Sequence, residues 1–244
     1  MRREANSEPS VGEIWRLTRR FPRCGRGFWF GLAIDVLWPV LVLSSKLRMR
    51  GALPERGGVL VASNHLSFAD PITVTAFCLA SGRVPRYLAR NDLWRIPLVG
   101  RVMRSGGHIP VHRGTARAQD AYRDAVRAAE DGECVLFFPE ATFSDDPEHW
   151  PARGKNGIAR VALTTGVPVI PLANWGTHRL LPRGGLPRPF RRTPIDLVAG
   201  PAVPLDDLMG KPLTAAVLRE ATDRIMAAIT ALLADARAEE PPAA

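Results

Sequence analysis

A histidine and an aspartate follow a short apolar run, and together they could carry out acid–base chemistry. The run at residues 58–64 (GVLVASN) ends in Asn64, His65 follows at once, and Asp70 lies five positions further on. On a continuous helix, five steps of about 100° would put the two side chains about 140° apart, so pairing requires a turn between them. A carboxylate on one ring nitrogen fixes the imidazole tautomer and prepares the other nitrogen to take a proton. The pattern therefore indicates a general base, His65, with Asp70 as its orienting carboxylate.

A structural interpretation of the same residues stays open. Asp-Pro is a common helix start, so Asp70 could merely cap a helix over residues 71–81 and leave His65 as a polar strand end. Two further strand ends favour the chemical interpretation. The apolar run at 133–139 leads into Glu140 and Thr142, and the run at 107–111 leads into Arg113. Ligands of open α/β sheets bind at the carboxyl ends of the strands, where these side chains would gather.

The elements that must position these residues alternate between short apolar runs and helical patterns. This alternation predicts an α/β fold, a mixed and largely parallel sheet flanked by helices. We expect helices over 71–81, 115–131, 157–165 and 214–238, and strands over 58–64, 107–111, 133–139, 167–175 and 195–205. Gly132 and Gly166 mark the ends of two of these helices.

Composition narrows the class of protein. The chain has 244 residues, of which 46% are hydrophobic and 23% charged, which is long and apolar enough for a large core and excludes global disorder. A formal net charge of +9, carried mostly by Arg, predicts anionic partners. The three Cys lie far apart, and His108 and His112 lack a further ligand at suitable spacing, so we expect neither a disulfide framework nor a metal site.

The N-terminal part carries one strongly apolar run, residues 28–44, flanked on both sides by basic residues. Its seventeen residues include Asp35 and Pro39, whereas a spanning helix needs about 20 apolar residues. We expect a helix that lies in the membrane surface. A true span, a buried core helix and a signal peptide remain alternatives. The predicted organisation is a membrane-associating segment over 1–46 and a catalytic domain over 47–244.

Four ordered motifs resemble those of the glycerolipid acyltransferases of the 1-acylglycerol-3-phosphate O-acyltransferase type, across roughly residues 50–210. They are N-H-x4-D at Asn64, His65 and Asp70; G-x-I-x-V-x-R at Gly107, Ile109, Val111 and Arg113; F-P-E-G-T-R-S, here FPEATFS at 138–144; and V-P-V-I-P at 167–171. The resemblance implies transfer of a fatty acyl group from acyl-CoA or acyl carrier protein to the hydroxyl of a lysophospholipid. The donor is a co-substrate, and no resident cofactor is expected.

The third motif departs from the family pattern, with Ala141 for Gly and Phe143 for Arg. The cation that the family places near the acceptor phosphate is therefore missing from this motif. Arg113 remains as the cation of the second motif, and Arg153 and Lys155 could take over phosphate binding; otherwise the acceptor lacks a phosphate monoester. The resulting set of substrate-binding candidates is Asn64, Arg90, Arg113, Glu140, Ala141, Thr142, Arg153 and Lys155.

The leading acceptor is 1-acylglycerol 3-phosphate, which would give phosphatidic acid and place the chain in phospholipid biosynthesis. Alternatives are glycerol 3-phosphate or a lyso form of an amino- or glycolipid. We expect an anionic membrane surface as a partner, at the cytoplasmic face of the cell membrane, in a peripheral or monotopic arrangement. A basic lipid- or nucleic-acid-binding protein is the alternative of another class, but RNA-binding signatures are absent, so no nucleic acid partner is expected.

Overall fold

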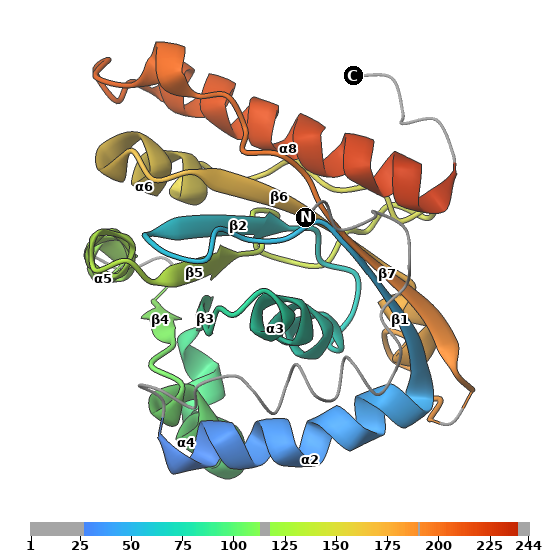
Figure 1. Cartoon of the computed structure of the whole chain (residues 1–244). Coiled ribbons are helices and arrows are strands. Elements are labelled where there is room, and N and C mark those ends of the chain that lie inside the picture. The colour runs from blue at the N-terminus through green and yellow to red at the C-terminus, as the bar shows by residue number, and fades with distance from the viewer. Residues whose placement is uncertain (1–26, 113–117, 190, 239–244) are drawn as a thin grey trace, which may run out of the picture.

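A seven-stranded sheet forms the centre of the computed structural model, which describes residues 27–112, 118–189 and 191–238 (Figure 1). The strand order is β1-β7-β6-β2-β5-β3-β4, and all neighbours are parallel except β6 and β7. The strands are β1 (Ser45–Arg50), β2 (Val59–Ser63), β3 (Pro85–Arg90), β4 (Ile109–Val111), β5 (Cys134–Phe137), β6 (Val169–Trp175) and β7 (Thr193–Ala199). The predicted α/β fold with a mixed, largely parallel sheet is confirmed.

Helices cover both faces of this sheet. Three of them, α5, α6 and α8, lie on one face; α3 lies on the other, with α2 and α4 in a further layer beyond it (Figure 1). Their bounds are α2 (Phe28–Ser44), α3 (Asp70–Ala80), α4 (Pro97–Ser105), α5 (Ala118–Glu130), α6 (Gly157–Thr165), α7 (Thr177–Leu180) and α8 (Ala215–Arg237), with short 3₁₀ turns η1 (Asn91–Arg95) and η2 (Asp206–Leu208).

Strand β2 is buried on both faces, which explains its unbroken apolar sequence. Val59 and Val61 pack in the core under α3, and Leu60 and Ala62 pack in the core under α6 and α8. Successive side chains of a strand point to opposite faces, so a central strand must be apolar at every position. The polar residues therefore begin only at the end of the strand, with Ser63 as its last residue and Asn64 and His65 directly after it.

The predicted helix at 28–44 is present with the same bounds, as α2, but the chain then continues directly into the sheet. Its next residues, Ser45–Arg50, form the edge strand β1, which pairs parallel to β7. The expected boundary between residues 46 and 47 lies inside this strand. Among the described residues, no helix combines the length and apolar character that crossing a bilayer requires.

Other expectations differ from the structure in detail. The helix ends at Gly132 and Gly166 are confirmed, since both glycines have positive φ. Strand β3 and helix α4 were not predicted, because PRYLAR and PLVGRVMRS mix cations with Pro or Gly and show neither a strand nor a long helix pattern. The last strand is shorter than the expected 195–205 and ends at Ala199, before Gly200 and Pro201.

Candidate active site

His65 and Asp70 are brought together by a tight turn after β2. The Nδ1 atom of His65 lies 2.8 Å from Oδ2 of Asp70, and the Asp70 N–H donates to the Ser67 carbonyl oxygen at 3.1 Å, which closes the predicted turn. Asp70 is fully buried, whereas the His65 side chain is 18% exposed. The carboxylate of the pair is therefore shielded from solvent, while the imidazole is partly accessible.

Asp70 serves this turn rather than capping the helix that it begins. Its Oδ2 also accepts the backbone N–H groups of Leu66 and Ser67, while α3 has no side-chain cap. The interpretation of Asp70 as a mere helix cap is therefore wrong. Because this carboxylate already accepts from several donors, Nδ1 of His65 must donate its proton to it, and Nε2 keeps the free lone pair that a base needs.

Two residues of distant segments hold the other oxygen of Asp70. Nδ2 of Asn174, in β6, donates to Oδ1 at 2.9 Å, and the Thr177 hydroxyl donates to the same atom. Asn64 fixes Asn174 in return: its side-chain Nδ2 donates to the Asn174 carbonyl oxygen at 2.9 Å, and its Oδ1 accepts the Asn174 backbone N–H at 2.8 Å. Asn64 is fully buried, so its position in the site is that of a clamp between β2 and β6.

Glu140 supports the backbone of the catalytic histidine candidate from the end of β5. Its Oε1 accepts the His65 backbone N–H at 2.9 Å, and its Oε2 accepts the Ala152 N–H at 2.7 Å. Burial raises the pKa of Glu140 from its usual 4.5 to about 7, against the lowering effect of these two N–H groups and of the nearby Arg183 charge. Glu140 therefore ties the loop at 141–156 to the turn at His65.

Ala141 adopts a backbone conformation that explains why the motif has glycine at this position. Its φ is +60°, in the left-handed region that costs an L-residue with a side chain about 1–2 kcal/mol. The tight turn after Glu140 is thus retained in this chain at the expense of local strain.

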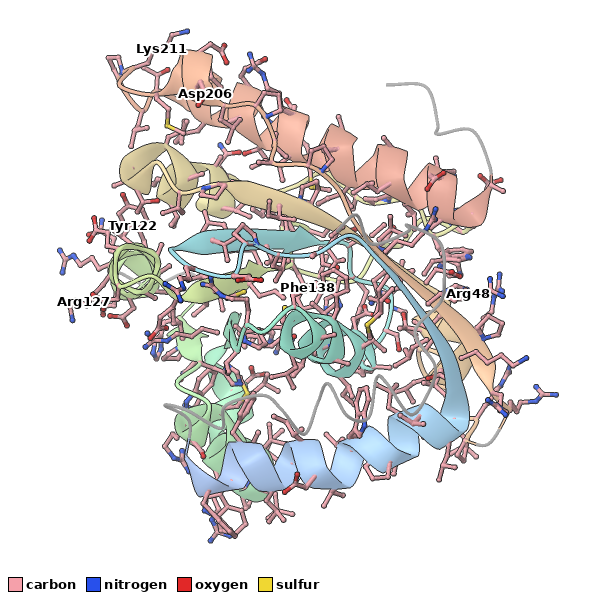
Figure 2. The ribbon with its side chains drawn as sticks, in the orientation of Figure 1. Arg48, Tyr122, Arg127, Phe138, Asp206 and Lys211 are labelled. Atoms are coloured by element: carbon pink, nitrogen blue, oxygen red, sulfur yellow. The ribbon has the colours of Figure 1, made fainter. Side chains whose placement is uncertain are left out.

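Aromatic rings surround the imidazole. Phe138 stacks on the His65 ring with 4.2 Å between centroids, and Phe143 lies 4.3 Å away at a tilt of 43°. Phe68, which is largely exposed, contacts Phe143 edge-on at 4.7 Å. Figure 2 labels Phe138 near the centre of the molecule, at the level of the sheet and α3. The residue that replaces the motif arginine therefore lies directly against the predicted base.

Of the predicted cations, those that the structure describes make no contact with His65. Arg90 is largely exposed and pairs with Asp92, with nitrogen–oxygen distances of 3.2 and 2.6 Å. Arg153 and Lys155 are exposed, and within the described residues their side chains make no hydrogen bond or ring contact. Thr142 is also exposed, and Arg113 lies outside the described residues.

Arg183 is a cation near the site that the sequence pattern did not single out. Its guanidinium carbon lies 4.6 Å from the centroid of the Phe143 ring, and its Nη1 donates to the Ser144 carbonyl oxygen at 2.7 Å and to Asp145 at 3.2 Å. Arg183 is one of several arginines in a Pro- and Arg-rich loop, and its neighbours in the sequence do not indicate that it lies over Phe143. The sequence neighbours of Asn174 and Thr177 do not indicate their placement either, although an amide near the end of an otherwise apolar strand could have drawn attention.

His108, one of the two histidines considered for a metal, has a structural partner instead. Its Nδ1 accepts the Tyr87 backbone N–H at 3.1 Å, and the ring is buried between Tyr87 and Phe30. In the described parts of the chain, no group of three metal-ligating side chains comes together.

The His65–Asp70 pair at the end of β2 fits the acyltransferase motifs, and comparison with known sequences agrees with this resemblance. A sequence model of the family described as "Acyltransferase" matches residues 46–175, more than half of the chain. The chain belongs to this acyltransferase family.

Named relatives narrow the comparison. The chain is 34% identical over 123 residues to a chloroplastic 1-acyl-sn-glycerol-3-phosphate acyltransferase of Brassica napus, which covers 50% of this chain and 34% of the relative. It is 31% identical over 106 residues to a lyso-ornithine lipid O-acyltransferase of Rhizobium meliloti, covering 43% of this chain and 35% of the relative. The first curated relatives are thus matched over about a third of their length.

A solved structure shares the fold. It is the 1-acyl-sn-glycerophosphate (LPA) acyltransferase, PlsC, from Thermotoga maritima, with a TM-score of 0.61 and 21% identity, covering 94% of this chain and 81% of that chain. The likeness of the fold therefore extends over almost the whole chain.

Proposed function

We propose that this protein transfers a fatty acyl group from a thioester, acyl-CoA or acyl carrier protein, to the free hydroxyl of a lysophospholipid. The observation that carries the proposal is the His65–Asp70 pair, in which Nδ1 of His65 lies 2.8 Å from the buried Asp70 carboxylate and the His65 side chain is partly exposed. The acceptor we favour is 1-acylglycerol 3-phosphate, which would give phosphatidic acid. The donor is consumed as a co-substrate, and the mechanism uses no resident cofactor.

The reaction follows from the tautomer that Asp70 imposes. Nε2 of His65 takes the proton of the acceptor hydroxyl, and the oxygen attacks the thioester carbonyl carbon. The tetrahedral intermediate collapses with cleavage of the carbon–sulfur bond, and the imidazolium returns the proton to the departing thiolate. Asp70 stabilises the imidazolium between these steps without itself becoming protonated. The products are an ester and a free thiol, with no acyl-enzyme.

A second acceptor class is favoured by a specific residue. Phe143 stands where the motif has a phosphate-binding arginine, and one relative is named a lyso-ornithine lipid O-acyltransferase. A lyso-aminolipid, whose head group lacks a phosphate, is therefore the alternative acceptor.

The membrane is proposed as the surface from which the acceptor is taken. Apolar side chains of α2 and α4 are exposed: Phe28, Trp29, Leu32, Val36, Leu37, Val40, Leu43, Leu98 and Val99. We call this set the apolar face. Arg101, exposed on α4, lies over the Trp29 ring at 5.0 Å, and Arg95 and Arg104 are exposed nearby in sequence. An apolar surface bordered by cations suits peripheral binding to anionic lipid, and we place it at the cytoplasmic face of the cell membrane.

The test is a thioester-consumption assay with a panel of lysolipids. We expect the wild-type protein to acylate lysophosphatidic acid, and His65→Ala to lower kcat at least ~10²-fold with the fold retained. Arg127→Ala serves as a control, because it removes an exposed side chain of α5, a helix that supplies none of the residues in contact with His65 or Asp70. Wild-type turnover in His65→Ala would contradict the assignment of His65 as the general base. Activity with the lyso-ornithine lipid alone would select the second acceptor.

A further inference from the structure

The substitution of Phe143 for the motif arginine removes one expected cation, and the predicted candidates that the structure describes make no contact with His65; Arg113 lies outside the described residues. Arg90 is engaged with Asp92 on the surface. Arg153 and Lys155 make no side-chain contact that would aim them at His65 within the described residues. Among the described residues, a different segment supplies a positive charge to the rings around the imidazole.

Arg183 brings such a charge to the same ring that replaced the arginine. Its guanidinium lies over Phe143 at 4.6 Å, and Phe143 in turn contacts the His65 ring at 4.3 Å. The three groups form a continuous series of contacts from the loop after α7 to the predicted base. Arginine is held well over an aromatic face, because the ring attracts the cation and the planar group stacks on it.

The hydrogen bonds that hold Arg183 use only one nitrogen of its guanidinium, which leaves the other N–H groups for a ligand. Both of its hydrogen bonds within the described residues come from Nη1, to the Ser144 carbonyl oxygen and to Asp145. The side chain is 37% exposed, and Nε and Nη2 donate no hydrogen bond to the described residues. Its charge also acts on the site itself, since it lowers the pKa of the buried Glu140 that holds the His65 backbone.

We propose that Arg183 is the acceptor-anion residue of this protein: it binds the phosphate of the lysophospholipid head group, with Phe143 as the platform that positions it. This rests on the proposed acyl transfer. A guanidinium presents parallel N–H donors that match two oxygens of a phosphate, and such charge-assisted bonds fix orientation as well as affinity. The cation of the third motif has moved to a different segment of the chain, and the aromatic residue at position 143 is what makes the new place possible.

The experiment measures KM for lysophosphatidic acid and for the acyl donor in Arg183→Ala and Arg183→Lys. We expect Arg183→Ala to raise the KM of lysophosphatidic acid at least ~10-fold, the size of one lost hydrogen bond to a charged group, and to leave the donor KM within about twofold. Arg183→Lys keeps the positive charge but loses the paired N–H donors of the guanidinium. Its KM for lysophosphatidic acid should therefore lie between those of the wild type and Arg183→Ala. Arg188→Ala removes an exposed arginine from the same loop and should change neither value.

A rescue variant makes the inference sharper. Phe143→Arg in the Arg183→Ala background restores the family's own cation and should recover part of the acceptor KM. If it recovers none, Arg183 does not replace the motif residue. Melting temperatures identify a variant that fails to fold, in which case Arg183→Gln takes its place.

The outcomes separate this inference from the proposed function. An unchanged acceptor KM in Arg183→Ala, an equal rise in the donor KM, or the same rise in Arg188→Ala would each overturn the role of Arg183 while acyl transfer stands. A wild-type protein that does not acylate lysophosphatidic acid would overturn the phosphate acceptor itself, before any variant is compared.

Discussion

The strand-end site and the apolar face depart from the ordinary burial rule in opposite directions. At the site, Asn64, Asp70, Asn174 and Thr177 are all fully buried polar residues. On the apolar face, the side chains of Leu98 and Phe28 are 65% and 73% exposed. Soluble proteins usually bury large apolar residues and expose polar ones.

The two regions meet the cost of this departure differently. Each buried oxygen of Asp70 accepts hydrogen bonds from at least two donors, so the buried charge is compensated inside the protein. The exposed apolar side chains have no such compensation within the described chain, and a lipid surface would supply it from outside. The comparison indicates that the first region is built to hold one geometry and the second to meet a partner.

The largest expected effect comes from breaking the buried network at its centre. Asp70→Asn keeps the shape but turns one accepting oxygen into an NH₂ group that faces N–H or O–H donors. We expect kcat to fall at least ~10²-fold, because Nδ1 of His65 loses its tautomer control, and stability to fall by about 1–3 kcal/mol. Steady-state kinetics and urea unfolding measure the two effects.

The control for this variant is Asp124→Asn, which makes the same change on the exposed side of α5. It should alter neither turnover nor stability. Asp70→Asn with normal kcat would show that the carboxylate does not orient the base.

Next in size is the loss of membrane binding when the apolar face receives charge. Leu98→Asp should weaken sedimentation with anionic vesicles at least ~10-fold, since burying a leucine contributes roughly 1.5–3 kcal/mol. High salt should weaken wild-type binding without abolishing it, because salt screens only the contribution of the arginines. Point changes are preferable to deleting residues 1–46, which would cut into β1.

Leu186→Asp is the matched control, since Leu186 is 84% exposed in the loop before β7, outside the apolar face. Equal loss of vesicle binding in both variants would move the membrane contact away from α2 and α4.

A smaller effect is expected at Glu140, where the buried carboxyl couples stability to pH. Its pKa is raised to about 7, so the folded protein holds this proton more tightly than the unfolded chain does. The contribution to stability is full below the ordinary value of 4.5 and is lost as pH rises through about 7. Glu140→Gln should flatten this decline between pH 5 and pH 8, and should lower stability by about 1–3 kcal/mol because one backbone N–H loses its acceptor.

Urea unfolding at pH 5, 6, 7 and 8 gives both quantities, with Glu130→Gln on the exposed end of α5 as the control. Parallel pH curves for wild type and Glu140→Gln would contradict the raised pKa.

The smallest effect is a gain. Ala141→Gly should stabilise the fold by about 0.5–1 kcal/mol, because glycine adopts positive φ without the strain of a Cβ and loses only part of that gain to backbone entropy. Ala202→Gly, at an exposed loop position that lacks positive φ, should be neutral or destabilising. Thermal unfolding decides: a lower melting temperature for Ala141→Gly would mean that the methyl group contributes packing that outweighs the strain.

Sequence patterns alone predicted the parts of this protein that depend on near neighbours along the chain. The pairing of His65 with Asp70, the helix over residues 28–44 and the helix end at Gly166 each follow from residue types a few positions apart. The four motifs also indicated the family, because their order along the chain reflects the order of the strands.

The tertiary structure decided everything that joins distant segments. Asn174 and Thr177 bind Asp70 from more than a hundred residues away along the chain, and β1 pairs with β7. Arg183, which follows β6 in the sequence, lies over Phe143, which precedes β6. The type of a residue determines what its side chain can bind. Its actual partner depends on which strands end next to each other at one edge of the sheet. That arrangement depends on packing over the whole core, and no local stretch of sequence contains it.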